Sequence, residues 1–291
     1  MNRLAFTVVL GCLPMACTTI ERASLPDPVS LGAQWEQASA TQQVAVDHGP
    51  WDAFLGRYLS TDAAGVNRVD YSRVTPDDQA KLDAYLNSLQ QVRTASLTRD
   101  QQLAFWINLY NAQTVDIVLE AYPVESILKI KDGILPTGPW KRKVVTVDGE
   151  SLSLNDIEHR IIRPVYREAR IHYALNCAAR SCPNLSPRAW RAAGLDQAFE
   201  DAERAYVNDP RGISISDDGK LTLSKIYIWF QEDFGANEAE VLSRLKQFAN
   251  PPLREKLQGR TRVDNYVYDW ALNDAATVQQ PDAVASLAIN K

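Results

Sequence analysis

The stretch Thr98–Tyr122, TRDQQLAFWINLYNAQTVDIVLEAY, decides the fold because it predicts one long helix. Thr98 is a residue type that caps helices, Asp and Gln follow it, and Pro123 comes directly after the stretch. On such a helix Trp106 and Tyr110 share one aromatic-rich face. We therefore expect a helical domain in which this segment has a central place.

Shorter elements are predicted before and after this helix. Further helices are predicted over residues 34–46, 50–59, 76–92, 153–163, 187–209, 225–234 and 237–249. Hairpins are predicted at Asp148-Gly149 and Asp218-Gly219, and extended segments over residues 65–74, 169–176 and 260–273. The sequence thus predicts an α+β fold, a predominantly helical single domain with a small, mostly antiparallel sheet and two hairpins.

The composition is that of a folded soluble protein. The 291 residues are 45% hydrophobic and 23% charged. The net charge of -5 and the pI of about 5.3 do not favour nucleic acid, so no nucleic-acid partner is expected. No repeat and no change of composition divides the chain, which predicts one domain over residues 46–275.

The first residues have the pattern of a bacterial lipoprotein signal. Arg3 precedes the apolar run Leu4–Leu13, which is too short to span a bilayer, and small residues surround Cys17. We expect Cys17 to be lipidated, although simple secretion and cleavage before Cys12 are alternatives. The predicted divisions are a signal peptide over 1–16, a tether over 17–45 and a flexible tail over 276–291. The membrane partner would be the outer membrane, with the domain facing the periplasm.

The stretch Ile171–Leu185, IHYALNCAARSCPNL, contains the chemistry of greatest interest. In an oxidising compartment its two cysteines, Cys177 and Cys182, can persist as a disulfide. If residues 171–176 form a strand, His172 and Cys177 lie on opposite faces unless the chain turns before Cys177.

A carboxylate lies within the predicted helix over 153–163. Glu158 falls inside the buried stripe that Leu154, Ile157 and Ile161 define, and His159 lies at its edge. A buried carboxylate must be paired, hydrogen-bonded or protonated. One interpretation is a salt bridge to an arginine such as Arg180, and the other is a carboxylate that orients an imidazole or binds a metal.

Four interpretations of the cysteines remain open. Cys177 can be a nucleophile with His172 or His159 as base and Glu158 as the orienting carboxylate. A Cys177–Cys182 disulfide would contribute about 2 kcal/mol in the chain-entropy model. Glu158, His159, His172 and Cys177 can all bind zinc, but their spacing matches no common zinc signature, and no cofactor is expected. Finally, Cys177 can be an inert core residue.

Five motifs, AFWINLYNAQTVDIVLEAYP, LSLNDIEHRIIR, IHYALNCAARSCPNL, SKIYIWFQEDFG and VYDWALN, resemble the DUF547 family over about residues 50–275. The family name records an undefined function, and its bacterial members are often exported. The resemblance points to Trp106, Asn108, Tyr110, Asn111, Glu158, His159, His172, Cys177, Pro183, Trp229, Asp233 and Trp270.

Two main functions follow from these residues. The first is a cysteine-dependent hydrolase or acyl transferase of the cell envelope. The second is a non-catalytic binding domain with a structural disulfide, in which the candidate binding residues are Asn108, Asn111, Tyr110 and Asp233. A redox protein cycling Cys177 and Cys182 ranks last, because such proteins generally use closer spacing.

Overall fold

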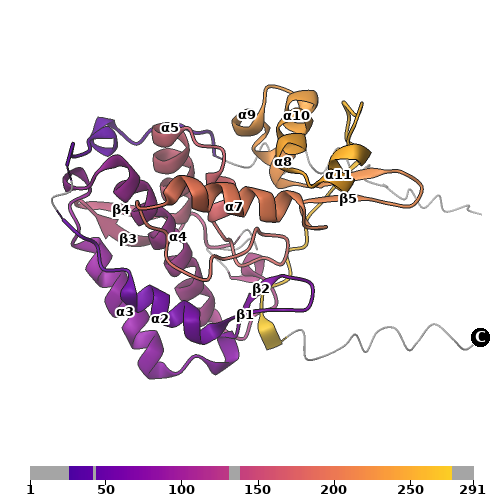
Figure 1. The fold of residues 1–291 in the computed structure, drawn as a ribbon. Coiled ribbons are helices and arrows are strands. Elements are labelled where there is room, and N and C mark those ends of the chain that lie inside the picture. The colour runs from indigo at the N-terminus through magenta and orange to yellow at the C-terminus, as the bar shows by residue number, and fades with distance from the viewer. Residues whose placement is uncertain (1–25, 42–43, 131–137, 277–291) are drawn as a thin grey trace, which may run out of the picture.

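The computed structural model describes residues 26–41, 44–130 and 138–276. Its longest helix, α4 (Arg99–Ala121), lies among the other helices of the larger part of the molecule (Figure 1). Thr98 caps α4 by accepting a hydrogen bond from the Gln101 amide, and the Gln101 side chain bonds back to the Thr98 amide. The predicted central helix is confirmed, and it ends before Pro123.

Two helices form successive layers on α4. The helix α3 (Pro76–Gln90) packs on α4, and α2 (Gly49–Tyr58) packs on α3. The remaining helical elements are η1 (Ala33–Glu36), η2 (Tyr71–Arg73), η3 (Thr94–Ser96), η4 (Ile127–Lys129), η5 (Asp156–Ile162), α5 (Arg163–Tyr166), α6 (Ile171–Ala174), α7 (Leu195–Val207), α8 (Ile226–Trp229), α9 (Gln231–Phe234), α10 (Glu238–Phe248) and α11 (Pro251–Lys256).

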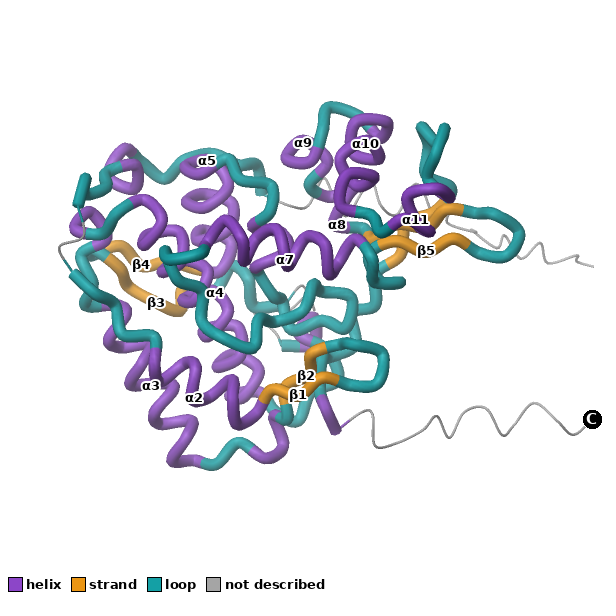
Figure 2. Tube along the Cα trace, in the orientation of Figure 1, coloured by secondary structure: helices purple, strands orange, loops and turns teal. Residues whose placement is uncertain are grey.

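The strands form three small sheets (Figure 2). They are β1 (Leu59–Thr61) with β2 (Asn67–Val69), β3 (Lys143–Val147) with β4 (Glu150–Ser153), and β5 (Ile213–Ile215) with β6 (Leu221–Ser224) and β7 (Asn265–Val267). All pairs are antiparallel except β6 with β7. Asp148 and Gly149 join β3 to β4 with positive φ angles of 50° and 84°, as a tight hairpin turn requires. The predicted α+β class is confirmed.

The buried apolar side chains form two hydrophobic clusters. The first surrounds α4 and includes buried residues of α2, α3, β3 and β4. The second includes buried residues of β5, β6 and α8–α10, which lie together on the upper right of Figure 1, and of α6 and α7. Ala202 and Trp270 pack against both clusters and so connect them.

Several local predictions from the sequence differ from the structure. Where a helix is predicted over 34–46, the described residues form only the short η1. Residues 169–176 contain the short helix α6 rather than a strand, so the argument from alternating strand faces does not apply. A short apolar run cannot be assigned to helix or strand by periodicity alone. The helix predicted over 153–163 is a π-helix, η5, which continues into α5 past Pro164. The helix predicted over 187–209 begins only at Leu195.

Candidate functional site

The candidate site is built around a long irregular segment, residues 175–194, which we call the motif loop. It connects α6 to α7 and has neither helix nor strand, yet half of its residues are buried. Buried backbone groups outside regular structure need hydrogen-bond partners from elsewhere. Long irregular segments of this kind inside compact domains are usually functional.

Two asparagines of α4 supply such partners. Asn108 bonds to both backbone groups of Trp190: its Nδ2 donates to the carbonyl at 2.8 Å, and its Oδ1 accepts from the amide at 2.9 Å. Asn111 donates to the Ala174 carbonyl at 2.9 Å and accepts from the Asn176 amide at 2.8 Å. Both asparagines are therefore clasps that hold the chain at the two ends of the motif loop.

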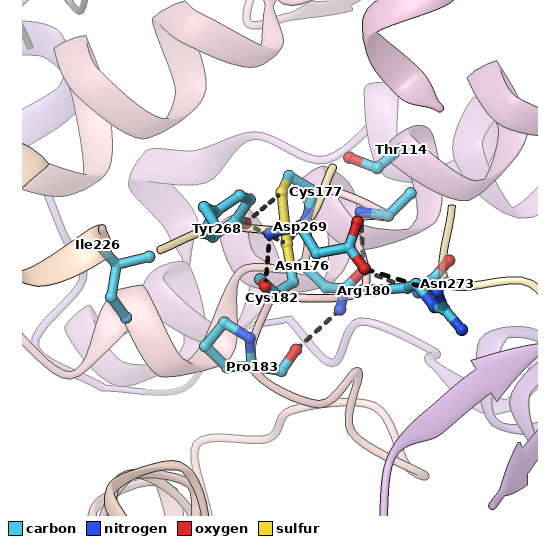
Figure 3. Close-up of a disulfide and its surroundings, with 12 residues drawn as sticks. Thr114, Asn176, Cys177, Arg180, Cys182, Pro183, Ile226, Tyr268, Asp269 and Asn273 are labelled. Atoms are coloured by element: carbon cyan, nitrogen blue, oxygen red, sulfur yellow. Dashed lines mark hydrogen bonds and ion pairs between the residues drawn. A yellow bond between two sulfur atoms is a disulfide. The ribbon is translucent and has the colours of Figure 1, made fainter. Parts of the chain in front are cut away.

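Further side chains hold the middle of the motif loop. Asn176 Nδ2 donates to the Pro183 carbonyl at 2.8 Å, as Figure 3 shows. Arg211 Nη1 donates to the carbonyls of Arg180 and Cys182, each at 3.1 Å. Tyr206 donates to the Ser181 carbonyl at 2.6 Å. Sequence reasoning missed Tyr206 and Arg211, because nothing in their local pattern indicates so distant a partner.

A disulfide joins Cys177 to Cys182 within this loop (Figure 3). Their Cα atoms are 6.3 Å apart, within the range that disulfides span. The Tyr268 hydroxyl lies 3.1 Å from each sulfur. Cys177 is partly buried and Cys182 is 3% exposed. The structure therefore agrees with the disulfide among the four interpretations of the cysteines.

The second part of the site is a buried charged cluster around His172. His172 Nε2 lies 2.7 Å from Asp233 Oδ2, and the ring stacks on Phe230 with 4.0 Å between centroids. Burial lowers the pKa of His172, so the ring is neutral, and we assign the proton to Nε2 because Asp233 accepts it. Burial raises the pKa of Asp233, but hydrogen bonds from His172 and Arg163 outweigh that effect and hold this pKa at about 2.

Arg163 extends this cluster. Its side chain is 2% exposed and donates to Asp233 Oδ2 at 2.7 Å and to Glu232 Oε1 at 2.9 Å. Its Nη1 lies 3.4 Å from His159 Nδ1. Burial, and then the charge of Arg163, lower the pKa of His159 to about 3, so His159 is neutral. Arg163 was not among the residues that sequence reasoning singled out.

Glu158 connects the cluster to α4. Its Oε1 lies 3.9 Å from His172 Nδ1, and η5, which carries Glu158, packs against α4. Burial raises the pKa of Glu158. The interpretation that paired Glu158 with Arg180 is wrong, because Arg180 pairs with Asp269 at 3.6 Å.

The parts of a cysteine–histidine–glutamate triad are not in contact. Within residues 26–41, 44–130 and 138–276, neither His159 nor His172 hydrogen-bonds to Cys177, whose sulfur contacts Cys182 and Tyr268. The same residues include no group of three or more His, Cys, Asp or Glu side chains placed to hold a metal ion. The described arrangement positions backbone and buries charge rather than presenting a nucleophile to a base.

The fold and the loop define a helical α+β domain with a disulfide-closed motif loop. Residues 94–207 match the family described as "Protein of unknown function, DUF547", so the chain contains a DUF547 domain at those residues. The matched region includes α4, η5 and the whole motif loop, whereas Asp233 and Tyr268 lie outside it. No curated protein and no solved structure matches the chain. None of the helices in the described part of the chain has the length and hydropathy that crossing a membrane requires.

Proposed function

We propose that this protein is a non-catalytic binding domain of the cell envelope, in which the motif loop is a rigid recognition element. One observation carries the proposal: the polar residues of the family motifs are used to hold backbone and one another. Asn108 and Asn111 clasp the motif loop, and the sulfur of Cys177 is bonded to Cys182. A loop ordered in advance binds with less loss of conformational entropy.

The charged cluster around His172 fits this function. Asp233 and Glu232 belong to α9, whereas Arg163 and His172 belong to the part of the chain that precedes the motif loop. Breaking a buried pair of this kind is costly, because it leaves an uncompensated charge. The cluster therefore fastens the second hydrophobic cluster beside the loop.

Thiol alkylation of the purified protein tests the proposal. Without reductant, we expect no labelling of Cys177 or Cys182 by iodoacetamide in the folded protein. After reduction, Cys177 should label up to about 100-fold faster at pH 8 than at pH 6, because an ordinary thiol pKa is about 8.5. Cys182 is buried and should label slowly at both pH values. The readout is the alkylation rate of each cysteine by peptide mass spectrometry.

The variant His172→Gln makes the test specific, and His48→Gln is its matched control. His48 is a second buried histidine, bonded to Tyr85 at 2.7 Å, and neither is a motif-loop residue. We expect both variants to leave the labelling rate of reduced Cys177 unchanged. The proposal would be overturned if reduced Cys177 is alkylated nearly as fast at pH 6 as at pH 8, and if this alkylation rate falls at least tenfold in His172→Gln but not in His48→Gln.

That outcome would support the second candidate, a cysteine-dependent hydrolase or acyl transferase. The observation in its favour is that Cys177 is the more exposed cysteine of the disulfide. In this candidate, a cellular dithiol reduces the disulfide and becomes oxidised itself. The freed Cys177 thiolate then attacks an acyl carbonyl, expels an amine or alcohol that takes up a proton, and holds the acyl group as a thioester.

We further propose that Cys17 anchors the domain to the outer membrane, facing the periplasm. The support is the signal-like sequence of residues 1–16, which lie outside the described residues together with Cys17. Expressed in a bacterium with its leader, the protein should partition into the detergent phase of Triton X-114, and Cys17→Ser should move it to the aqueous phase. Aqueous partition of both forms would contradict the lipid anchor.

A further inference from the structure

A cavity of about 630 Å³ lies between α2 and α3 and belongs to neither the motif loop nor the charged cluster. Its lining residues are Asp47, Pro50, Ala53, Phe54, Arg57, Tyr58, Asp78, Lys81, Leu82, Ala84, Tyr85 and Ser88. On each helix they recur at intervals of three and four, so that each helix presents one continuous face to the cavity. A cavity of this volume is within the range of small-molecule sites.

The interior of the cavity is mainly apolar. Phe54, Tyr58, Leu82 and Tyr85 are each at most 6% exposed and form its floor. Exposed residues of both helices, among them Ala53 and Ala84, line its walls. A hydrocarbon chain in the cavity gains free energy from the apolar area that is still accessible to water, at about 25 cal/mol per Å² covered.

One end of the cavity is cationic. Arg57 reaches it from α2 and Lys81 from α3, with side chains 62% and 70% exposed. Both pair with Asp78, at 2.9 Å and 2.7 Å. Asp78 also accepts hydrogen bonds from Tyr58 at 2.6 Å and from Thr75 at 3.2 Å. Two cations thus share one carboxylate among the lining residues here, and each keeps donors for an incoming anion.

The opposite end of the cavity carries a negative charge instead. Asp47, which precedes α2, accepts a hydrogen bond from the Gly49 amide at 2.8 Å and also lines the cavity. The helix α2 has 10 residues and is about 15 Å long, close to the length of an extended chain of about twelve carbons. The charges favour a ligand with its anionic group at Arg57 and Lys81.

We propose that this cavity binds an amphipathic carboxylate, a fatty acid of medium chain length. Its carboxylate bonds to Arg57 and Lys81, and its hydrocarbon chain covers Phe54, Leu82 and Tyr85. The inference goes beyond the function proposed for the motif loop and does not depend on the state of Cys177. A cationic amphiphile of equal chain length meets two like charges at the same place.

Isothermal titration of the folded protein with laurate, below its micelle concentration, tests the proposal. We expect saturable binding of one laurate, and at least tenfold weaker binding of dodecyltrimethylammonium. The double variant Arg57→Gln/Lys81→Gln should weaken laurate binding at least tenfold. Asp78 keeps its bonds to Tyr58 and Thr75 in that variant, so we expect it to fold. Lys220→Gln, which removes an exposed lysine paired with Asp218, is the matched control and should bind laurate normally.

A second variant, Ala84→Trp, places a large side chain on the cavity wall and should abolish laurate binding. Because Ala84 is exposed, the variant should keep the wild-type circular dichroism. The absence of saturable laurate binding, or equal binding of both amphiphiles in wild type and both variants, would overturn the proposal. So would a concentration-dependent dimer that Ala84→Trp disrupts, because the cavity would then be an interface between two copies.

Discussion

At the scale of the residue, amide side chains replace the hydrogen bonds that a sheet would supply. Asn108, Asn111 and Asn176 each bond to two or more backbone groups, and all three are at most 5% exposed. An asparagine is suited to this use because its amide offers both a donor and an acceptor. These residues therefore have a physical role that needs no ligand.

The substitution Asn108→Ala should be strongly destabilising. It leaves the amide and the carbonyl of Trp190 without their partner, and each unsatisfied buried group costs about 1–3 kcal/mol. We expect the free energy of unfolding in urea to fall by about 2–4 kcal/mol. The control Asn87→Ala, at an exposed site on α3, should change it by less than about 0.5 kcal/mol. Equal effects would contradict the clasp.

Asp116 on α4 provides a prediction about pH. It is 7% exposed, and its carboxyl group accepts a hydrogen bond from Gln113 Nε2 at 2.9 Å. Burial and neighbouring acids raise its pKa from 3.8 to about 7. The folded state thus binds a proton that the unfolded state has lost above pH 4, so its contribution to stability disappears as the pH rises through 7.

The substitution Asp116→Asn removes this titration. We expect the melting temperature of the variant minus that of the wild type to be several degrees greater at pH 8 than at pH 5. Thermal unfolding at the two pH values, followed by circular dichroism, measures the difference. The same gap between variant and wild type at both pH values would show that Asp116 does not titrate in this range.

At the scale of the element, the sequence predicted secondary structure correctly where local signals agree with one another. It was misleading where contacts with distant parts of the chain determine the backbone conformation. The helix α4 has a capping box and an uninterrupted pattern, and its prediction is confirmed. The segment around α6 has a strand-like composition, but its backbone is held by Asn111 of α4. The π-helix η5 is equally invisible in the sequence, because apolar spacing does not distinguish one extra residue per turn.

The disulfide should stabilise this part of the chain modestly. It closes a loop of only six residues, which predicts about 2 kcal/mol in the chain-entropy model. We expect dithiothreitol to lower the melting temperature of wild type by several degrees and to leave that of Cys177→Ser/Cys182→Ser unchanged. A wild-type melting temperature that reductant does not alter would contradict a stabilising role.

At the scale of the whole molecule, a buried charged cluster connects two hydrophobic clusters. Sequence reasoning and the family resemblance singled out Glu158, His172 and Asp233, and the structure brings them together. They did not identify Arg163, which pairs with α9 across 69 and 70 residues of sequence. Such a pairing depends on the arrangement of the whole chain, which no local pattern records.

Removing Arg163 should loosen the second hydrophobic cluster. We expect Arg163→Ala to lower the free energy of unfolding by about 3–5 kcal/mol, because Asp233 loses its buried partner. Arg160→Ala is the matched control on the preceding turn, where the side chain is 43% exposed and pairs with Asp156 at 3.4 Å. It should cost no more than about 1 kcal/mol. Equal losses in urea unfolding would contradict the role of Arg163 as a fastening residue.

Hydrogen–deuterium exchange of the motif loop tests the central claim most directly. If side chains hold this loop rigid, the amides of Asn176, Ala178 and Trp190 should exchange as slowly as those in the middle of α4, although they lie in neither helix nor strand. In Asn108→Ala, the Trp190 amide should exchange much faster. Rapid exchange of all three amides in the wild-type protein would contradict the account.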